Sequence, residues 1–490
     1  MTREYLVTLL GVGIAALVAA GCGGGTTAGP MPDAGPPSET SICDHNAVCD
    51  GDETCASCRE DCGSCAVQDI PGQRAKFVDR ACPQNGDGLT DACAAGAGTA
   101  GRFNDLQAAL DSLVAGDTLY VYAGDYWRDV RGGDSEGVFT LGAHETVDAP
   151  IVVTAREASD PPTLHSCDPS NLTFCPLPAL AVYGNHVVVD HLNIRGRAQL
   201  WGAADSTMQY LTCTHGWGAC GDGNWACLRI EACTRCRARY NWVHSVAGRG
   251  QGEACLPPET TTNEDRGAGL KEFTSDGTLW EFNTVQDVPR GAYDLHRHSV
   301  RSIVRFNRFE IEPTAIGIRL ERTAFFEAYG NVIVNPGAPG PGAGCIHLIG
   351  RDERLAPGAQ SRMDAHHNTC VGVQDGITFS PDLSGRIENN LGSGLVAGGE
   401  SPKNLALAPG GASFSDYNAF DANADYRTQV YNGSEYATLA EWQAATGYDT
   451  YSRAAAGGAC TLDPATLAAT DGTCTTMSST GGAVGAFGLT

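Results

Sequence analysis

The fold is decided by three phrases that repeat one asparagine: EFNTV (281–285), RFNRF (305–309) and YGNVI (329–333). The series runs Asn283, Asn307, Asn331, Asn368 and Asn389, with intervals of 24, 24, 37 and 21 residues. One coil every 20 to 25 residues, with loops inserted at some turns, predicts a β-solenoid. Asparagines at one corner of each coil can stack into a hydrogen-bonded ladder, so we predict that these residues are structural.

Working outward from the asparagines, a strand opens each coil in the phrases GLKEF (269–273), YDLHRH (293–298), GIRLER (317–322), CIHLI (345–349) and GITF (376–379). Side chains alternate between the two faces of a strand. The predicted inward residues are Leu270, Leu295, Ile318, Leu320, Ile346, Leu348, Ile377 and Phe379. The predicted outward residues are Lys271, Asp294, His296, Arg319, Glu321 and His347. With coils stacked about 4.8 Å apart, we expect Lys271 to lie about 5 Å from His296 and about 10 Å from Arg319.

The phrases before and after the repeat agree with this fold. NDLQAALDSLVAGDTLYVYAGDYW (104–127) contains a helical pattern followed by a strand, and it resembles the N-terminal cap of right-handed parallel β-helices. LAEWQAATGYDTYS (439–452) and GGAVGAFGLT (481–490) resemble the C-terminal part of secreted β-helix proteins. The resemblance implies an all-β, right-handed parallel β-helix of the pectin-lyase-like type over residues 70–490, with an N-terminal helical cap.

Composition excludes several other classes of protein. The 490 residues include 62 glycines, and 42% of them are hydrophobic, which fits a glycine-rich β protein and neither collagen nor a disordered chain. Acidic residues outnumber basic ones by 57 to 32, a formal charge of -25. A surface of that sign repels phosphate, so we expect no nucleic-acid partner.

The N-terminus carries an export signal. Residues 1–22 contain Arg3, an apolar run too short to span a membrane, and small residues before Cys22, and they resemble a bacterial lipoprotein signal. The resemblance implies lipidation of Cys22 and an exported protein anchored to the outer membrane or cell surface, whose membrane contact is the lipid alone. Residues 23–41, rich in Gly, Pro and Ser, are expected to be a flexible tether.

Cysteines divide the rest of the chain into local groups. Without Cys22, 20 remain, and disulfides are expected in an exported chain. Six of them lie in 42–66, a module too small to bury a core, so bridges of undetermined connectivity are expected to hold it together. Six more lie in 213–255, which we predict to be a cysteine-rich lobe; the others are Cys82 and Cys93, Cys167 and Cys175, Cys345 and Cys370, and Cys460 and Cys474.

A second resemblance concerns the outward residues. The phrases GLKEF, LHRHS and GIRLE occur in the order found in polysaccharide lyases of the alginate lyase and chondroitinase B type. The resemblance implies β-elimination on a uronate polymer, with Lys271 as base, Arg297 or its neighbour His296 as the second catalytic group, and Arg319 binding substrate. Asp294, Glu321 and His347 would complete the binding face. Calcium is the cofactor it implies, with Asn241, Glu264 and Asp265 as candidate ligands.

Two other functions stay open. A glycoside hydrolase on the same fold would draw paired carboxylates from Glu272, Asp294 and Glu321. A non-catalytic surface protein would only hold a glycan or a partner, and the tryptophans near the cysteine-rich lobe would supply stacking surfaces: Trp201, Trp217, Trp225 and Trp242. A lyase creates an unsaturated sugar end, a hydrolase creates only a reducing end, and a binding protein creates neither. The sequence does not indicate an oligomeric state.

Overall fold

The computed structural model describes most of the chain from residue 73 onward. The described residues are 73–128, 137–142, 149–166, 177–214, 226–246, 267–288, 291–337, 343–351, 355, 361–379, 383–393, 403–407, 414–421, 427–430, 434–436, 438–455, 460, 462, 467, 469–470, 474–479 and 483–486. The predictions for Cys22, the tether, the 42–66 module, Glu264 and Asp265 fall outside these residues, as does much of the cysteine-rich lobe.

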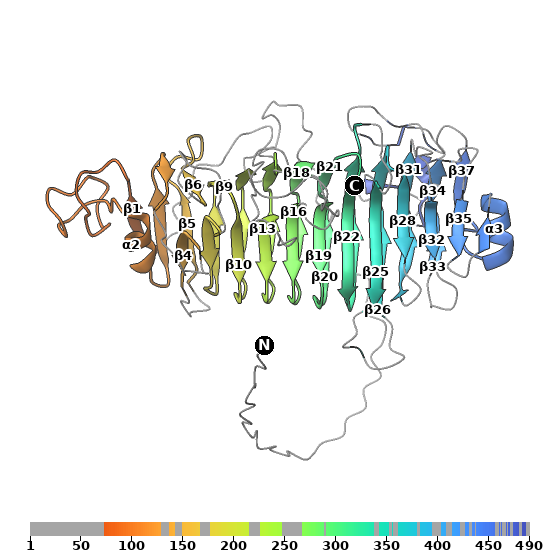
Figure 1. Ribbon diagram of the computed structural model, residues 1–490, viewed down its shortest axis with the longest axis horizontal. Helices are drawn as coiled ribbons and strands as arrows, with labels where there is room; N and C mark the ends of the chain where they lie inside the picture. The colour runs from red at the N-terminus through yellow and green to blue at the C-terminus, as the bar shows by residue number, and fades with distance from the viewer. Residues whose placement is uncertain are drawn as a thin grey trace, which may run out of the picture. The chain divides into compact units, whose positions relative to one another are not determined.

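Three long sheets make up the solenoid (Figure 1). Sheet A contains β1 (Arg74–Val78), β2 (Asp117–Val121), β5 (Ile151–Ala155), β8 (Val187–Asp190), β11 (Thr207–Gln209), β14 (Arg237–Arg239), β17 (Leu279–Glu281), β20 (Ser302–Arg305), β23 (Phe325–Tyr329), β26 (Ser361–His366), β29 (Leu383–Ser384), β30 (Arg386–Glu388) and β33 (Phe414–Asp416). Sheet B contains β4 (Phe139–Leu141), β7 (Leu180–Val182), β10 (Ala198–Trp201), β13 (Ala226–Glu231), β16 (Ala268–Phe273), β19 (Gly291–His296), β22 (Ile316–Thr323), β25 (Gly344–Arg351), β28 (Asp375–Phe379), β32 (Lys403–Leu407), β35 (Arg427–Val430) and β36 (Ser434–Tyr436).

Sheet C completes each coil. It contains β3 (Asp125–Tyr126), β6 (Thr163–His165), β9 (Asn193–Arg195), β12 (Thr212–Thr214), β15 (Trp242–His244), β18 (Thr284–Val288), β21 (Arg308–Ile311), β24 (Val332–Val334), β27 (Thr369–Val371), β31 (Leu391–Ser393), β34 (Ala419–Asp421) and β37 (Arg453–Ala455). Through the central coils, such as β16, β17 and β18, the chain visits sheets B, A and C in turn, and each strand pairs in parallel with the equivalent strand of the next coil. The described chain is therefore a parallel β-helix, as the sequence predicts.

The core lies inside the three sheets. The predicted inward residues Leu270, Leu295, Ile318, Leu320, Ile346, Leu348 and Ile377 are all buried and belong to one continuous apolar cluster. Alternation along the opening strands therefore predicts the inner face correctly. The Phe379 side chain is outside the described set.

The asparagine ladder runs up one corner, between sheets A and C. Its members are Asn241, Asn283, Asn307, Asn331, Asn368, Asn390 and Asn418, and each side-chain amide donates to the carboxamide oxygen of the next at 2.9–3.1 Å. Every member is almost fully buried, so these bonds satisfy polar groups that would otherwise lose their water. The prediction of a ladder is confirmed, but Asn389 was the wrong residue: the next residue, Asn390, belongs to the ladder, and the Asn389 amide donates to Ser479 instead.

The residue before each ladder position turns the chain. At this corner φ is positive, for example 55° at Tyr240, 54° at Phe282 and 54° at Phe306. These rings stack coil on coil, with centroids 5.0 Å apart for Tyr240 and Phe282 and 5.3 Å apart for Phe282 and Phe306. A backbone conformation that usually favours glycine or asparagine is thus accompanied by aromatic packing.

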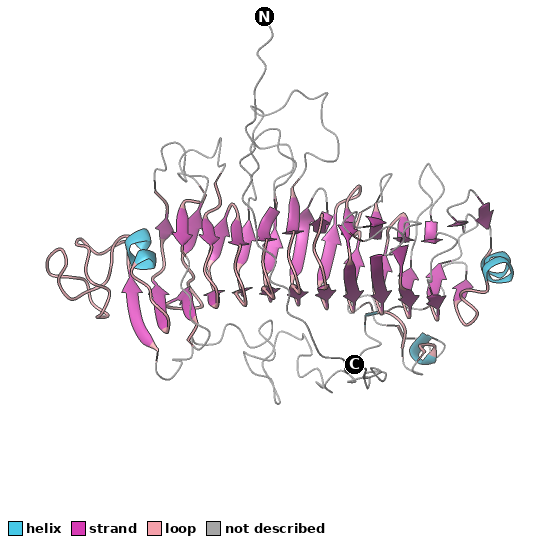
Figure 2. Ribbon diagram, turned by 90° about the horizontal axis from the view of Figure 1, so that it is seen from below, coloured by secondary structure: helices cyan, strands magenta, loops and turns pink. Residues whose placement is uncertain are grey.

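Helices lie near the two ends of the solenoid (Figure 2). Helix α2 (Leu106–Asp111) is capped by Asp105 and packs on β1 and β4, which confirms the predicted N-terminal cap over a shorter span than its pattern covers. Helix α3 (Leu439–Thr446) packs on β36, and a short 3₁₀ turn, η2, spans Cys474–Thr476. None of the helices in the described residues is both long enough and apolar enough to cross a bilayer.

Disulfides follow the local groups of cysteines. The described bonds are Cys82–Cys93, Cys213–Cys227, Cys345–Cys370 and Cys460–Cys474. The expectation that every cysteine of the mature chain is bonded is wrong for Cys233 and Cys236, which are free thiols. Both are buried, and burial raises the pKa of the Cys233 thiol, so the pair acts as small apolar residues of the core.

Candidate functional site

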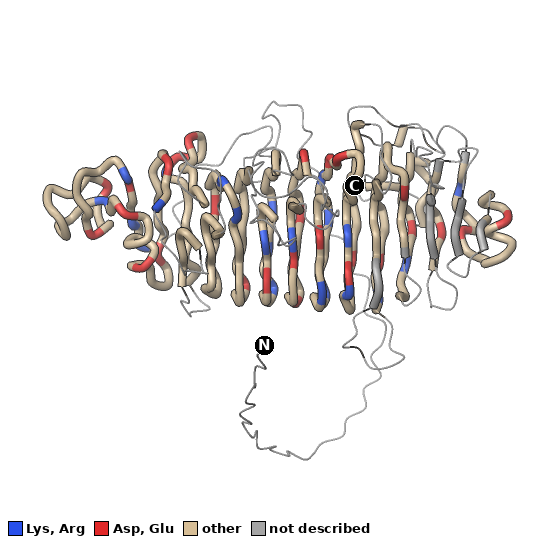
Figure 3. The backbone as a smooth tube through the Cα atoms, viewed as in Figure 1, with Lys and Arg blue, Asp and Glu red and all other residues tan. Residues whose placement is uncertain are grey.

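Two columns of side chains, all polar or charged except one phenylalanine, stand on the outer surface of sheet B. Strand register places Arg229, Lys271, Asp294, Arg319 and His347 in one column. The second column, two residues further along each strand, contains Glu231, Phe273, His296 and Glu321. We call these nine residues the charged face. Figure 3 shows basic and acidic positions interleaved along the central strands.

Lys271 lies at the centre of the charged face in an ion pair. Its Nζ is 3.1 Å from Oδ2 of Asp294, and the two side chains are 0% and 1% exposed. The same Nζ lies 5.1 Å from the centroid of the Phe273 ring. Register therefore places Asp294 beside Lys271, while His296 stands next to Phe273, contrary to the expected neighbour relation between Lys271 and His296. Lys271 points outward, as predicted, and is nevertheless buried.

Arg319 links the two columns. Its guanidinium is 3.4 Å from Asp294 and 3.3 Å from Glu321, one carboxylate in each column. Glu321 in turn lies 3.0 Å from Nδ1 of His296. The His296 imidazole, followed by Arg319 and Arg322, lowers the pKa of Glu321 against the opposing effect of partial burial. Glu321 is therefore an ionised carboxylate that orients His296, whose side chain is 18% exposed.

The remaining predicted residues lie at the margins of this cluster. Arg297 falls just after β19 at φ 63°, exposed in the turn, so His296 takes the outward place on the strand. His347 points outward from β25, with Nε2 3.9 Å from Asp375. Its ring also fills the space beside Gly344, where an added Cβ would come within 2.1 Å of Nε2. By strand register, His347 lies one coil beyond Arg319.

Glu272 does not belong to the charged face. It points into the solenoid, is 0% exposed, and accepts hydrogen bonds from four donors: Thr278 (2.6 Å), Trp280 (2.8 Å), Tyr293 (2.8 Å) and Ser302 (2.6 Å). These bonds replace the water that a buried carboxylate loses. As a candidate for paired hydrolase carboxylates Glu272 was therefore wrong, because no substrate reaches the core.

Asn241, a candidate calcium ligand, is the first described member of the asparagine ladder. Its carboxamide oxygen accepts from the Leu211 backbone at 2.9 Å, and its amide donates to Met208 and Asn283. The Asn241 carboxamide is therefore used in hydrogen bonds of the ladder, and its assignment as a calcium ligand was wrong. Among the described residues, the only group of three possible metal ligands close to one another is Asp79, Cys82 and Cys93. The two cysteines of this group form a disulfide with each other. The carboxylates of the charged face are already paired with cations, so the described residues do not fit a calcium site.

Arg229 and Phe273 of the charged face were not predicted from the sequence, nor was the contact of Arg229 with Trp201, one of the tryptophans expected to offer a stacking surface. The Arg229 guanidinium lies 4.6 Å from the centroid of the Phe273 ring and 5.9 Å from that of Trp201. Trp201 is 39% exposed at the end of β10. The alternation that identifies Lys271 as outward also applies to LRIE (228–231) and AQLW (198–201), so the signal was present in the sequence.

Comparison with known proteins adds the following findings. No protein-family model matches the chain, and no curated protein matches it in sequence. Similar solved structures include an alginate lyase from Paenibacillus sp., with a TM-score of 0.41 and 14% identity over 62% of this chain and 93% of that one. A pectate lyase gives 0.42 and 12% over 68% and 79%, and a rhamnogalacturonan lyase gives 0.40 and 13% over 66% and 84%.

Proposed function

We propose that the charged face binds an acidic polysaccharide and cleaves it by β-elimination. The observation that carries the proposal is the linked group His296–Glu321–Arg319: an oriented, partly exposed imidazole beside a guanidinium that contacts two carboxylates. β-Elimination on a uronate needs these two functions, a base for the proton next to the carboxyl group and a cation for the carboxylate.

Substrate binding begins with the cations. Arg319 is partly exposed, Arg322 more so, and Arg297 lies in the adjoining turn. A planar guanidinium can bind a carboxylate through two parallel hydrogen bonds. The -25 charge of the chain opposes long-range attraction of an anionic polymer, so these local contacts must supply the affinity.

His296 is the base in this proposal. Glu321 holds Nδ1 of the ring, which leaves Nε2 to take the proton from the carbon next to the uronate carboxyl. The electron pair of that C–H bond forms a carbon–carbon double bond as the glycosidic C–O bond breaks. The leaving oxygen then takes a proton from water. The imidazole thus has a ring nitrogen that can accept the proton, whereas the Lys271 amine is buried in an ion pair with Asp294 and fixes the position of that carboxylate.

The geometry disfavours the hydrolase alternative. A hydrolase needs one carboxylic acid that stays protonated and one carboxylate. Glu272 lies in the core, the pKa of Glu321 is lowered, and Asp294 is held between Lys271 and Arg319. None of the three has the environment of a proton donor to a leaving group.

The test is ultraviolet absorbance of the unsaturated product while the chain is incubated with alginate, pectate and glycosaminoglycans, with and without calcium. We expect absorbance to rise on a uronate polymer and His296→Gln to lower the rate about 100-fold or more. The matched control is His366→Gln, since His366 lies 3.0 Å from Glu327 in a similar pair on sheet A and is 20% exposed. This control should keep the wild-type rate.

Other outcomes separate the alternatives. Reducing ends without absorbance would establish a hydrolase, and retention on a polymer with neither product would establish a binding protein. A normal rate in His296→Gln together with loss in Lys271→Met would assign the base to Lys271 and overturn the role given to His296. Dependence on added calcium would direct attention to Glu264 and Asp265.

We further propose that the protein acts outside the cytoplasm, lipid-anchored through Cys22 at the outer membrane or cell surface. The support is the N-terminal signal pattern of residues 1–22 together with the disulfides of the solenoid, which form readily only in an oxidising compartment. A polymeric substrate too large to enter a cell suits that location.

A further inference from the structure

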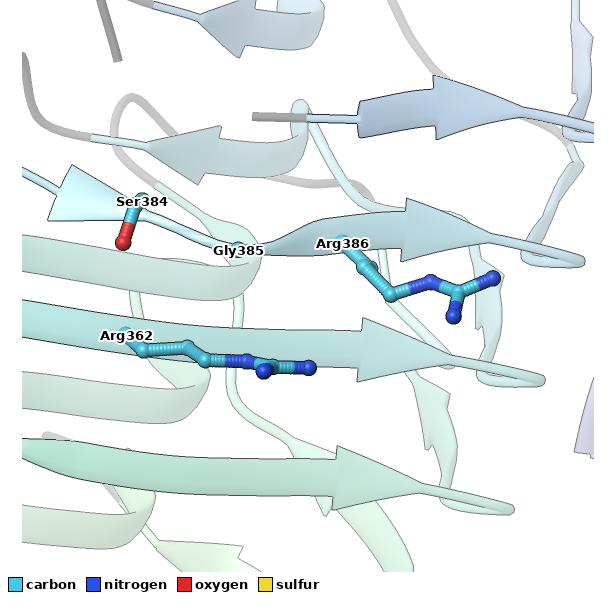
Figure 4. A pocket seen from close by; sticks show the side chains of 4 residues that line it. All are labelled: Arg362, Ser384, Gly385 and Arg386. Atoms are coloured by element: carbon cyan, nitrogen blue, oxygen red, sulfur yellow. The ribbon is translucent and has the colours of Figure 1, made fainter. Parts of the chain in front are cut away.

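A second surface with binding features lies on sheet A, away from the charged face of sheet B. It spans the consecutive strands β23, β26, β30 and β33. One pocket of about 290 Å³ is lined by Arg362, Ser384, Gly385 and Arg386 (Figure 4). Its neighbour, of about 330 Å³, shares Arg362 and reaches Phe325 and Arg301. We call Phe325, Arg362, Ser384, Arg386 and Phe414 the sheet A surface.

Two phenyl rings mark the ends of this surface. Phe325 on β23 is 47% exposed and Phe414 on β33 is 40% exposed, although large apolar side chains on a sheet usually gain by burial. Three strand spacings separate them, about 14 Å along the axis of the solenoid. An exposed ring offers a flat apolar surface against which the C–H face of a pyranose can pack. A spacing of this size corresponds to about three sugar units.

The polar groups between the rings come as neutral pairs. Arg362 donates three hydrogen bonds to Asp364, at 3.3, 3.0 and 2.8 Å, and Arg386 donates to Glu388 at 2.8 Å. Arg386 also lies over the Phe414 ring, 5.4 Å from its centroid. Both arginine side chains are more than half exposed, whereas Asp364 and Glu388 are 18% and 13% exposed, so solvent meets mainly guanidinium N–H groups with a smaller share of carboxylate oxygen beside them. Adjacent donors and acceptors suit the hydroxyl groups of a sugar and do not select for its charge.

The first pocket exists because the strand breaks at Gly385. There φ is 149°, and an added Cβ would come within 1.9 Å of the Met363 carbonyl oxygen. The Arg386 N–H donates to the Asp364 side chain at 2.9 Å, while Ser384 stays paired with Arg362 across the sheet. Figure 4 shows the two arginines extending in the same direction from neighbouring strands, with Ser384 on the segment before Gly385, at the opposite side from their guanidinium groups. The break thus opens a hollow on an otherwise continuous sheet.

From these contacts we infer that the sheet A surface is a carbohydrate-binding site, distinct from the charged face. It takes a polysaccharide segment of about three pyranose units, stacked on Phe325 and Phe414 and hydrogen-bonded through its hydroxyls to Arg362 and Arg386. The surface goes beyond the proposed β-elimination because it holds a chain without cleaving it. Because recognition is through ring faces and hydroxyls, binding here is insensitive to salt and to the carboxylates of the polymer.

The test is affinity electrophoresis in gels containing alginate, pectate, or the carboxyl-reduced form of each. Every protein in the test carries His296→Gln, so that the polymer stays intact. The chain with no further substitution serves as the wild type. We expect Phe325→Ala/Phe414→Ala to weaken retention about 10-fold or more on a polymer and on its carboxyl-reduced form. The control is Tyr451→Ala, which removes a ring that is 62% exposed outside this surface and should change nothing.

Each contrary result overturns the inference. Wild-type protein retained on none of the polymers, or a double variant retained as well as wild type, would exclude a carbohydrate site here. Retention that disappears when the carboxyl groups are reduced would mean that charge, not ring stacking, holds the chain. Since the readout is retention and not product, failure of the lyase proposal leaves this result readable.

Discussion

At the scale of single residues, several outward arginines form an ion pair with a carboxylate on their own strand. Arg319 with Glu321, Arg308 with Glu310, Arg362 with Asp364 and Arg386 with Glu388 are separated by two positions and share a face. Each pair is partly exposed, so its contribution to stability is small, below about 1 kcal/mol. Its larger effect is to remove long-range charge from the surface and leave directed hydrogen-bonding groups.

His367 is a buried histidine that should make the stability of the fold depend on pH. Burial, and secondarily the charge of His366, lower the pKa of His367 to about 4. The unfolded chain binds its proton near pH 6.5, so the folded state loses stability as pH falls from about 6.5 to 4. We predict that His367→Asn removes on the order of 2–3 kcal/mol of this loss, measured by denaturant unfolding across that pH range.

Asparagine suits the position because His367 has φ 53°, and Asn389 and Gly330 occupy the equivalent corner of neighbouring coils. Above pH 7 the variant and the wild type should therefore unfold at similar denaturant concentrations. Parallel pH profiles for the two proteins would show that His367 does not control the response.

Individual residues also show what the sequence could predict about the site. Alternation from Leu270 places Lys271 outward and Glu272 inward, so the inward position of Glu272 was available from the pattern alone. The ion pair of Lys271 with Asp294 depends on the register between coils, which the alternation within one strand does not determine. The burial of Lys271 depends on what covers the strand, which alternation does not describe.

At the scale of structural elements, the asparagine ladder connects sheet A to sheet C in seven successive described coils. Asn307 accepts from the Asn283 backbone at 2.9 Å, and its amide donates to the Trp280 and Arg305 carbonyl groups and to Asn331. Two earlier coils have Leu192 and Leu211 at the same corner, both buried. A leucine therefore fits the space but satisfies none of the hydrogen bonds.

We predict that Asn307→Leu lowers the free energy of unfolding by about 3 kcal/mol, because several buried donors and acceptors lose their partners. Equilibrium denaturation measures the change. The reciprocal variant Leu211→Asn lengthens the ladder at Asn241, whose oxygen already accepts from residue 211, and should stay within about 1 kcal/mol of wild type. Equal losses in both variants would mean that volume, not hydrogen bonding, governs this corner.

The ladder shows why element boundaries are harder to predict than the repeat. The Asn389–Asn390 doublet offers two candidates, and counting intervals selects the wrong one. Every other ladder residue lies two positions after the last residue of its sheet A strand, as Asn307 follows Arg305. Glu388 ends β30, so strand position identifies Asn390 where the interval does not.

At the scale of the whole solenoid, stability depends on contacts between neighbouring coils, and the terminal coils need caps. At the C-terminal end Asp449 accepts hydrogen bonds from Trp442, Ser415, Ser452 and Asn418, the last ladder residue described. Trp442 is 1% exposed and belongs to the main core. Helix α3 is thus joined to the core and to the ladder at one point.

We predict that Trp442→Ala destabilises this end by about 3–5 kcal/mol, through the cavity it leaves and the lost bond to Asp449. Hydrogen exchange should rise first in β33, β34 and β37 and leave β5 and β8 near wild-type protection. Uniformly faster exchange along the chain would instead indicate a single cooperative unit with no preferential opening at the cap.

The parallel register of sheets A and B has an evolutionary consequence. Duplicating the coil made of β22, β23 and β24 would add one strand to each sheet and lengthen both surfaces by one strand spacing, about 4.8 Å, because β22 carries Arg319 of the charged face and β23 carries Phe325 of the sheet A surface. That step is comparable with the length of one sugar unit. A lineage of such proteins could therefore lengthen the charged face and the sheet A surface together, one monosaccharide at a time, by gene duplication rather than by remodelling either site.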